Sequence, residues 1–291
     1  MSFSENNYNK LMKVSIIVPN RNYANFLPVC LDSIASQTYQ NIEVLLADGS
    51  SEDGSLGILE DYSRRYDWKI FSLSDKGQAD AINKGLSIAT GDIQCWLNSD
   101  DYFLSNKALE KVVEIYQEFS DLDVVSLGGY YTNENGYWLR PVLLNTHPLQ
   151  RQTDIAFRGA FLQPATFWKR HVFEELNGLD STYRFSFDSH FLIRAGQRFN
   201  MLLDQNIKIS GYRLHGSNLS VGVKPERIKE LAEFNRYFFG FGFRYLYLNF
   251  IAAIVSFICL FPNAISKKIN YVIYLISNLA SFLSLYRIPS I

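Results

Sequence analysis

The sequence has few cysteines and little basic charge among its first ten residues. It contains three cysteines, which lie far apart in apolar stretches: Cys30, Cys95 and Cys259. An odd number of cysteines without metal-ligand spacing argues against a disulfide framework or a zinc site and favours a reducing compartment. The polar N-terminus, MSFSENNYNK, lacks the basic and apolar pattern of a secretory signal. We therefore expect a cytoplasmic protein.

Neither sign of charge dominates the chain. The 28 basic and 29 acidic residues give a formal net charge of -1. Proteins that bind nucleic acid usually carry a strongly basic face, so we expect no nucleic-acid partner. The 291 residues are enough for one large α/β domain, or for one domain with an appendage.

The first half of the chain alternates between two hydrophobic patterns. Short apolar runs have the length of buried strands, and amphipathic helix patterns lie between them. This alternation favours a doubly wound, largely parallel sheet, whose ligands bind at the carboxyl ends of the strands. The expected strands cover residues 14–18, 42–47, 70–73, 93–97 and 124–127, and the expected helices cover residues 27–36, the segment after DGSSEDGS, 79–89 and 106–119.

The second half is mixed. Asn135-Gly136 stands between two aromatic-rich runs and predicts a β-hairpin. Helices are expected at residues 187–198, opened by Asp188, and at residues 226–239, with Pro225 in the first turn. The segment YRLHGSNLS is expected to form a polar loop.

The strand expected at 93–97 leads directly into Asn98, Ser99, Asp100 and Asp101. Such residues are common in turns and helix caps, so this cluster alone does not establish a site. Alternatively, the cluster forms a site for Mg²⁺ or Mn²⁺ at the edge of the sheet. These cations prefer oxygen ligands and can bind phosphates at the same time.

The order of these segments resembles the inverting glycosyltransferases of family 2. The similar stretches are VSIIVPNRN, LDSIASQTYQNIEVLLADGSSEDGS, SDKGQADAINKGLSIATGDIQCWLNSDD, FLQPATFWKRHVFEELNGLD and FDSHFLIR. The resemblance implies the GT-A fold, a Rossmann-like mixed but largely parallel sheet flanked by helices. It also implies an enzyme that uses a nucleotide-diphosphate sugar, with a UDP-sugar favoured, and a divalent cation, Mn²⁺ or Mg²⁺.

The resemblance also implies roles for particular residues in donor binding. Contacts to the base and ribose are expected from the end of the first strand and from the DGS turn. Further contacts are expected along the nucleotide cleft, where a lysine on a solvated helix face is the alternative for Lys84. The first group is Pro19, Asn20, Asp48 and Asp53, and the second is Asp80, Asn83 and Lys84.

LNSDD resembles the acidic metal motif of the family, with Asn98 in place of its first aspartate. Asp100 is then the principal metal ligand, Asp101 a second ligand or an acceptor for a sugar hydroxyl, and Asn98 a carbonyl donor to the metal or a sugar contact. His215 matches a late histidine that completes the metal or diphosphate site in related enzymes. One fewer carboxylate is expected to weaken cation binding.

The resemblance places the catalytic base at Asp188, where the apolar neighbour Phe187 would raise the carboxyl pKa by desolvation. Gln163 and Trp168 are expected to line the acceptor or donor sugar pocket, with core packing as the alternative for Trp168.

The last part of the chain is apolar. Residues 245–262 and 271–286 carry almost no charge, each with a stripe of small or weakly polar residues. A shallow or re-entrant membrane hairpin is favoured over helices packed on the rest of the protein, and it would hold the enzyme on the inner face of the cell membrane as a peripheral or monotopic protein. The expected division is a flexible N-terminus (1–12), a GT-A catalytic domain (13–222, with a nucleotide-sugar half at 13–129 and an acceptor half at 130–222), an amphipathic helix (223–244) and membrane-associating apolar helices (245–291).

These features together predict a hexosyl- or N-acetylhexosaminyltransferase that acts on a lipid-linked saccharide in cell-surface polysaccharide assembly, with homo-oligomers left open. The alternatives are a nucleotidyltransferase of similar fold, or an inactive module that binds a sugar nucleotide or glycan, since Asn98 and Phe187 depart from the acidic residues common in the family.

Overall fold

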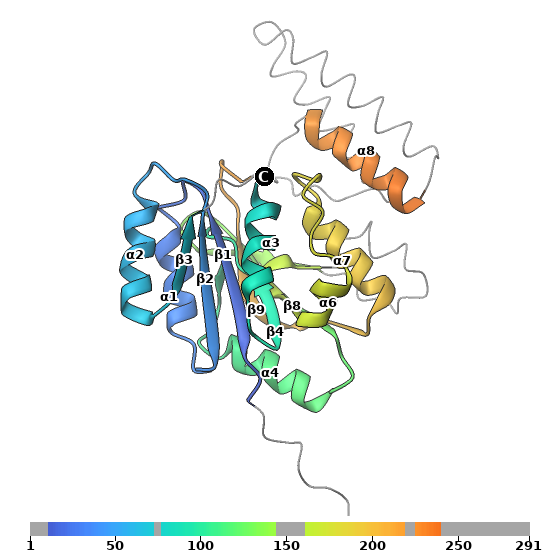
Figure 1. Ribbon diagram of the computed structural model, residues 1–291, viewed down its shortest axis with the longest axis horizontal. Coiled ribbons are helices and arrows are strands. Elements are labelled where there is room, and N and C mark those ends of the chain that lie inside the picture. Colours follow the sequence, from blue (N-terminus) through green and yellow to red (C-terminus); the bar gives the residue numbers. More distant parts are fainter. Residues whose placement is uncertain (1–10, 73–76, 144–160, 219–224, 240–291) are drawn as a thin grey trace, which may run out of the picture.

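The computed structural model describes residues 11–72, 77–143, 161–218 and 225–239 (Figure 1). Within these residues, one sheet of nine strands has the order β3-β2-β1-β4-β8-β6-β9-β5, and β7 extends β6 at one end. The strands are β1 (Val14–Asn20), β2 (Ile42–Asp48), β3 (Lys69–Ser72), β4 (Ile93–Trp96), β5 (Tyr102–Phe103), β6 (Val124–Thr132), β7 (Trp138–Pro141), β8 (Thr166–Lys169) and β9 (Met201–Arg213). The helices are α1 (Leu27–Ala35), α2 (Ser55–Tyr66), α3 (Gln78–Ile88), α4 (Ala108–Glu118), α6 (Arg170–Glu175), α7 (Phe187–Arg198) and α8 (Pro225–Phe239), with a 3₁₀ turn at Gln163–Ala165.

The strands β1 to β4 run parallel, as the alternating pattern predicts. β1 lies between β2 and β4, and β3 pairs with the other edge of β2. The register puts Asn20 beside Asp48, and Ile17 beside Trp96 two residues before Asn98. The polar segments that follow these strands therefore meet at one edge of the sheet. β8 enters antiparallel between β4 and β6 and makes the sheet mixed.

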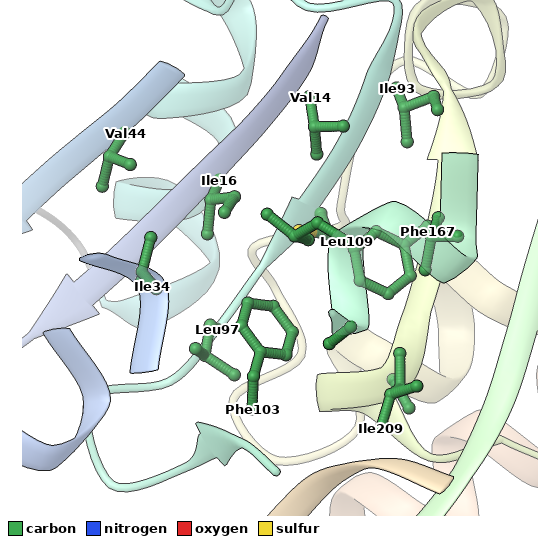
Figure 2. Packing of buried hydrophobic residues seen from close by; sticks show 14 of the residues in the cluster. Val14, Ile16, Ile34, Val44, Ile93, Leu97, Phe103, Leu109, Phe167 and Ile209 are labelled. Atoms are coloured by element: carbon green, nitrogen blue, oxygen red, sulfur yellow. The ribbon is translucent and has the colours of Figure 1, made fainter. Parts of the chain in front are cut away.

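Successive residues of β1 point to opposite faces of the sheet and so supply two cores. Val14, Ile16 and Val18 pack with α1, α2 and α4 in the larger core, part of which is shown in Figure 2. Ile17 faces the other core, which α3, α6 and α7 cover. The sheet is thus buried on both sides, which explains why its parallel strands are continuously apolar.

The hairpin predicted at Asn135-Gly136 is confirmed. β6 and β7 pair antiparallel, the backbone N–H of Asn133 donates to the Tyr137 carbonyl at 2.9 Å, and Gly136 has a φ of +83°. β9 was not predicted from the sequence. It is 13 residues long and runs parallel to β6.

The helix predicted at 187–198 has the same bounds in the structure, but Asp188 does not cap it. Ser186 is the N-cap residue, and Asp188 lies in the first turn. The Glu230 carboxylate on α8 instead accepts hydrogen bonds from the backbone N–H groups of Arg184, Phe185 and Ser186, at 2.5, 2.8 and 2.6 Å. α8, which lies within the amphipathic segment predicted at 223–244, therefore holds the start of α7 in place.

The apolar segment predicted to associate with a membrane, 245–291, lies outside the described residues. Among the residues that are described, no helix is long and apolar enough to cross a membrane.

His190 on α7 is buried among aromatic rings at the contact with α8. Its side chain is 3% exposed, the ring centroids of Tyr183 and Tyr237 lie 4.7 and 5.0 Å away, and neither ring nitrogen has a hydrogen-bond partner in the part of the chain that the structure describes. Burial, assisted by Arg194, lowers the pKa of His190 from 6.5 to about 4. Protonation therefore opposes folding.

We expect the free energy of unfolding to fall between about pH 6.5 and pH 4, because only the unfolded chain binds the His190 proton in this range. The contribution is on the order of 3 kcal/mol. In His190→Phe, urea unfolding at several pH values should show a shallower acid slope than in the wild type. The control His171→Gln removes a half-exposed histidine that pairs with Asp123 at 3.1 Å, and it should not make the acid slope shallower. An equal slope in His190→Phe would contradict the assignment.

Candidate functional site

The ends of β1 and β2 are joined by a hydrogen-bonded cluster. The Asn20 amide donates to Asp48 Oδ1 and to Ser51 Oγ, both at 3.1 Å. The Asp48 carboxylate also accepts bonds from the Ser51 backbone N–H at 2.9 Å and the Ser51 hydroxyl at 2.7 Å. Asn20 and Asp48 are 4% and 2% exposed, and Pro19 beside them is also buried. The predicted residues at these two strand ends are therefore brought together and fixed.

Asp53 orders the turn that leads into α2. Its carboxylate accepts bonds from the Ala24 backbone N–H at 2.8 Å and from the Ser55 backbone and hydroxyl at 3.0 and 2.6 Å. Burial alone would raise the pKa of Asp53, but these bonds together outweigh it and lower the pKa. The side chain thus links the loop after β1 to the start of α2.

Asn98 stands at the centre of an amide network beyond β4. Its Nδ2 donates to Gln163 Oε1 at 3.1 Å and lies 3.5 Å from Asp101 Oδ2, while its Oδ1 accepts from Gln78 Nε2 at 2.8 Å. Gln163 Nε2 donates in turn to the Trp96 carbonyl at 2.8 Å. The orientation of Asn98 is therefore set by partners on three different segments.

Asp100 contacts His215 directly. Their Oδ2 and Nε2 atoms are 3.0 Å apart, and Asn218 Nδ2 donates to the same carboxylate oxygen at 3.0 Å. The Asn218 side-chain oxygen accepts the His215 backbone N–H at 2.6 Å. The loop after β9 is thus folded so that His215 and Asn218 both face Asp100.

Asp101 lies deeper than its neighbour. It is 2% exposed, and its Oδ1 accepts the backbone N–H of Arg213 at 2.9 Å. Burial and the charge of Asp100 raise the pKa of Asp101 well above its usual range. Burial and the same two carboxylates also raise the pKa of Tyr23, to about 12. The acidic pair therefore creates a negative field, as expected where a cation is to bind.

Aromatic rings from the loop after β1 form one wall of this site. The Phe26 and Tyr23 ring centroids lie 4.3 and 5.6 Å from that of His215, and the Tyr23 hydroxyl donates to the Ser217 carbonyl at 3.0 Å. The Arg213 guanidinium lies 5.0 Å from the Phe26 centroid. Residues nearly 200 positions apart therefore build one surface around His215.

Asp188 is positioned by its neighbours on α7. Phe187 is 7% exposed and packs against Trp96, with 6.2 Å between the ring centroids, so the start of α7 is attached to the strand that delivers Asn98 and Asp100. The Asp188 carboxylate accepts the Ser189 backbone N–H at 2.6 Å. Burial raises the pKa of Asp188, which is the direction expected from Phe187.

The predicted cleft residues on α3 have partners within the fold. Lys84 pairs with Asp80 at 2.8 Å, and both amide atoms of Asn83 bond the backbone of Leu179 at 2.8 Å. The outer side of Asn83 and Lys84 lines an open cavity of about 360 Å³ that extends to Gly178 on the loop after α6. Asn83 therefore connects α3 to this loop, whereas donor contacts by Asp80 and Lys84 stay a prediction.

Trp168 does not line a sugar pocket in this structure. It is fully buried, and its ring packs against Trp96 and Phe191 at 5.3 and 5.1 Å between centroids. The core-packing alternative is therefore correct for Trp168. Gln163, which is 9% exposed, accepts a hydrogen bond from Asn98, and its contact with a sugar stays a prediction.

Comparison with known proteins identifies the family. A family model described as "Glycosyl transferase family 2" matches residues 15–176, which is more than half of the chain. The chain belongs to this glycosyltransferase family. A PGL/p-HBAD biosynthesis glycosyltransferase from Mycobacterium bovis is 29% identical over 220 residues, covering 75% of this chain and 83% of the relative. EpsJ of Bacillus subtilis, an uncharacterized glycosyltransferase, is 28% identical over 226 residues, with coverage of 73% and 64%.

Solved structures show the same fold. Staphylococcus aureus TarS in complex with UDP-GlcNAc has a TM-score of 0.62 at 20% identity, covering 83% of this chain and 79% of TarS. The mannosyltransferase PcManGT of Pyrobaculum calidifontis, in complex with GDP-Man and Mn²⁺, has a TM-score of 0.60 at 18% identity, with coverage of 92% and 80%. This glycosyltransferase therefore has the GT-A fold, as its sequence pattern and resemblance predict.

The sequence prediction missed several residues that surround the candidate site. Asn218 stands three residues after His215, so its position in the same loop was a usable signal. The other missed residues lie in segments whose contact with the acidic motif depends on the sheet order. They are Tyr23, Phe26, Gln78 and Arg213.

We expect Asn98→Asp to destabilise the metal-free enzyme. A carboxylate would replace the N–H donor that faces Gln163 Oε1 and lies near Asp101 Oδ2, and Gln163 cannot reverse its amide without losing its bond to the Trp96 carbonyl. The expected cost is about 1–3 kcal/mol, measured by thermal unfolding in EDTA.

Asn133→Asp is the matched control, because Asn133 Oδ1 only accepts bonds, from the backbone N–H groups of Asn135 and Tyr137. It should unfold at the wild-type temperature. An equal or higher melting temperature for Asn98→Asp would contradict the proposed orientation of Asn98.

Proposed function

We propose that this enzyme is an inverting glycosyltransferase that moves a sugar from a UDP-sugar to a hydroxyl of a lipid-linked saccharide in cell-surface polysaccharide assembly. The observation that carries the proposal is the contact between Asp100 and His215, 3.0 Å apart, at the sheet edge where the Asn20 and Asp48 cluster also lies. Ligands of open α/β sheets bind at this edge.

The Asn20 and Asp48 cluster is suited to a nucleoside. Asp48 offers carboxylate oxygens to a base N–H or to ribose hydroxyls, and Asn20 Oδ1 is a buried acceptor without a partner among the described residues. The structures of TarS with UDP and with UDP-GlcNAc support a UDP-sugar, whereas PcManGT is in complex with GDP-Man. The donor nucleotide is therefore varied in the experiment that tests the proposal.

The acidic motif fits a divalent cation with few protein ligands. In the described part of the chain, no group of three or more His, Cys, Asp or Glu side chains could hold a metal. Asp100 and His215 supply one carboxylate and one imidazole, and Asp101 supplies a further buried carboxylate. Mg²⁺ and Mn²⁺ commonly take their remaining ligands from substrate phosphates and water. When bound, the cation would neutralise charge on the leaving diphosphate.

Asp188 is assigned as the base that deprotonates the acceptor hydroxyl. Inversion requires the acceptor hydroxyl to attack the anomeric carbon from the side opposite the diphosphate. Because the acidic motif is expected beside the diphosphate, the base should come from a different element. α7 satisfies this requirement, and its first turn is held by Phe187 against Trp96 and by Glu230 through the preceding backbone. Burial raises the pKa of Asp188, which strengthens it as a base.

The test is release of nucleoside diphosphate from a panel of UDP-, GDP- and TDP-sugars with Mn²⁺ or Mg²⁺. Transfer predicts release of one nucleoside diphosphate per sugar moved and an inverted linkage in the product. Release of pyrophosphate would instead indicate a nucleotidyltransferase. Tight donor binding without turnover on any acceptor would indicate a binding module.

A lipid-linked acceptor is supported by the apolar sequence at 245–291 and by the similarity to a Mycobacterium bovis glycosyltransferase of PGL/p-HBAD biosynthesis. Membrane attachment is testable by fractionation of the full-length protein at low and high salt. Protein that stays in the supernatant without detergent under both conditions would contradict attachment.

A further inference from the structure

We propose that three aromatic side chains, Tyr102, Tyr130 and Trp138, form a strip that binds a sugar ring of the acceptor. The strip runs across one face of the sheet from the acidic motif to the β6–β7 hairpin. This inference rests on the glycosyltransferase function proposed above and assigns part of its acceptor site.

The inner end of the strip is attached to the acidic motif. Tyr102 directly follows Asp101, and its hydroxyl donates to the Gly136 carbonyl in the hairpin turn at 2.9 Å. The ring crosses β9 at Gly211, where a Cβ atom would lie only 2.6 Å from Tyr102 Cζ. The Arg213 guanidinium lies 5.3 Å from the ring centroid. Glycine at 211 therefore allows Tyr102 to bridge the site and the hairpin.

The outer end of the strip is exposed. Tyr130 pairs in register with Gly211, and Trp138 stacks on Tyr130 with 4.5 Å between centroids and 7° between ring planes. Trp138 is nevertheless 61% exposed, and Lys208 Nζ lies 5.8 Å from the Tyr130 centroid. The stack holds a flat apolar surface rigid beside a cationic hydrogen-bond donor.

This combination suits a saccharide. The C–H face of a pyranose is flat and apolar and packs against an aromatic ring, while its hydroxyls need polar partners such as the Lys208 ammonium and the Tyr102 hydroxyl. Because the strip begins one residue after Asp101, a sugar on it lies next to the place where the donor sugar is expected. The ring of Trp138, at the outer end of the strip, then binds the part of the acceptor that precedes the attacked hydroxyl.

Two other occupants fit less well. A membrane surface does not require the nearly parallel stacking of Trp138 on Tyr130, with 7° between ring planes. A stable protein partner needs about 800 Å² on each side. Three rings in a line, two of them partly buried, offer far less.

The fluorescence of Trp138 can itself report on binding at the strip. The other three tryptophans, Trp68, Trp96 and Trp168, are 7%, 1% and 0% exposed, so acrylamide quenching in solution reports mainly on Trp138. The probes are methyl glycosides of glucose, galactose, mannose, rhamnose and N-acetylglucosamine, together with cellobiose and maltose. We expect at least one of them to protect Trp138, and to show saturation transfer from the protein to C–H protons on one face of the ring.

The matched variants are Trp138→Ala, Trp138→Phe and Tyr137→Ala. The saturation-transfer signal should fall about tenfold in Trp138→Ala, corresponding to loss of one stacked ring. It should be largely retained in Trp138→Phe and unchanged in Tyr137→Ala. Once the panel above has identified donor and acceptor, the acceptor KM should rise in the same order.

The proposal is overturned if no saccharide protects Trp138, or if Trp138 is already shielded from acrylamide in the free protein, as it would be under another part of the chain. It is also overturned if vesicles of phosphatidylcholine and phosphatidylglycerol, rather than saccharides, protect Trp138 and lose affinity for Trp138→Ala. Hydrolysis of the donor by the wild-type enzyme without acceptor separates the two proposals, because it tests the transferase function without using the strip.

Discussion

Asp188→Asn is expected to lower kcat by about three orders of magnitude while leaving donor affinity unchanged. Asparagine has the same size and still accepts the Ser189 backbone N–H, so α7 should keep its first turn. It cannot take a proton from an acceptor hydroxyl. The loss should therefore appear in kcat and kcat/KM for transfer, and not in the dissociation constant of the donor measured calorimetrically.

The matched control is Asp180→Asn. Asp180 precedes the same helix, and its carboxylate accepts bonds from the backbone and hydroxyl of Thr182, which an asparagine oxygen also accepts. Its activity should stay within about twofold of the wild type, as for surface changes away from a site. Equal loss of donor binding in Asp188→Asn, or a kcat close to the wild type, would contradict the assignment of the base.

The pH dependence of kcat gives a second readout for Asp188. The base acts when deprotonated, and burial raises its pKa. Activity should therefore fall on acidification through a pKa above the usual carboxyl range, and residual activity of Asp188→Asn should lack this acid limb. A Glu230→Gln variant, which weakens the acceptor for the backbone before α7, should lower kcat and keep the limb, moved to lower pH because the Glu230 charge also raises the pKa of Asp188.

The sheet was largely predictable because its parallel strands are buried on both faces and appear as continuous apolar runs. β9 was missed for the opposite reason. Most of its first eight residues are only partly buried, and its polar residues Asp204, Gln205 and Asn206 interrupt the apolar pattern. A strand of this kind is specified by its pairing with β6 and not by local sequence.

The acidic residues of the candidate site were predictable for a related reason. Asp48 and Asp100 each follow an apolar run, so local sequence places both at strand ends. Sequence could not tell which partners orient them. Gln78 and Gln163, which fix Asn98, come from segments on either side of it, and Trp168 has the same local pattern whether its ring faces a pocket or the core. Such contacts depend on strand order, which the local pattern does not determine.

Asp100→Ala is expected to remove the metal dependence of donor binding. In calorimetric titrations with UDP, the wild-type dissociation constant in Mn²⁺ should be about a hundredfold lower than in EDTA, since loss of a cation ligand to a diphosphate costs several kcal/mol. In Asp100→Ala, the two values should converge. The control Asp61→Ala removes an exposed carboxylate that pairs only with Arg65 on α2 among the described residues, and it should behave as wild type.

Asp100→Ala should lose the metal dependence of donor binding and keep its fold. Removal of Asp100 breaks its bonds with His215 and Asn218, but it also removes a negative charge that raises the pKa of the buried Asp101. These effects oppose each other, so thermal unfolding in EDTA should change little. Asp100→Ala that still binds UDP more tightly in Mn²⁺ would contradict Asp100 as the principal ligand. If donor binding still depends on the metal in Asp100→Ala but not in His215→Ala, His215 is the principal metal ligand. An imidazole alone is a poor match for Mg²⁺.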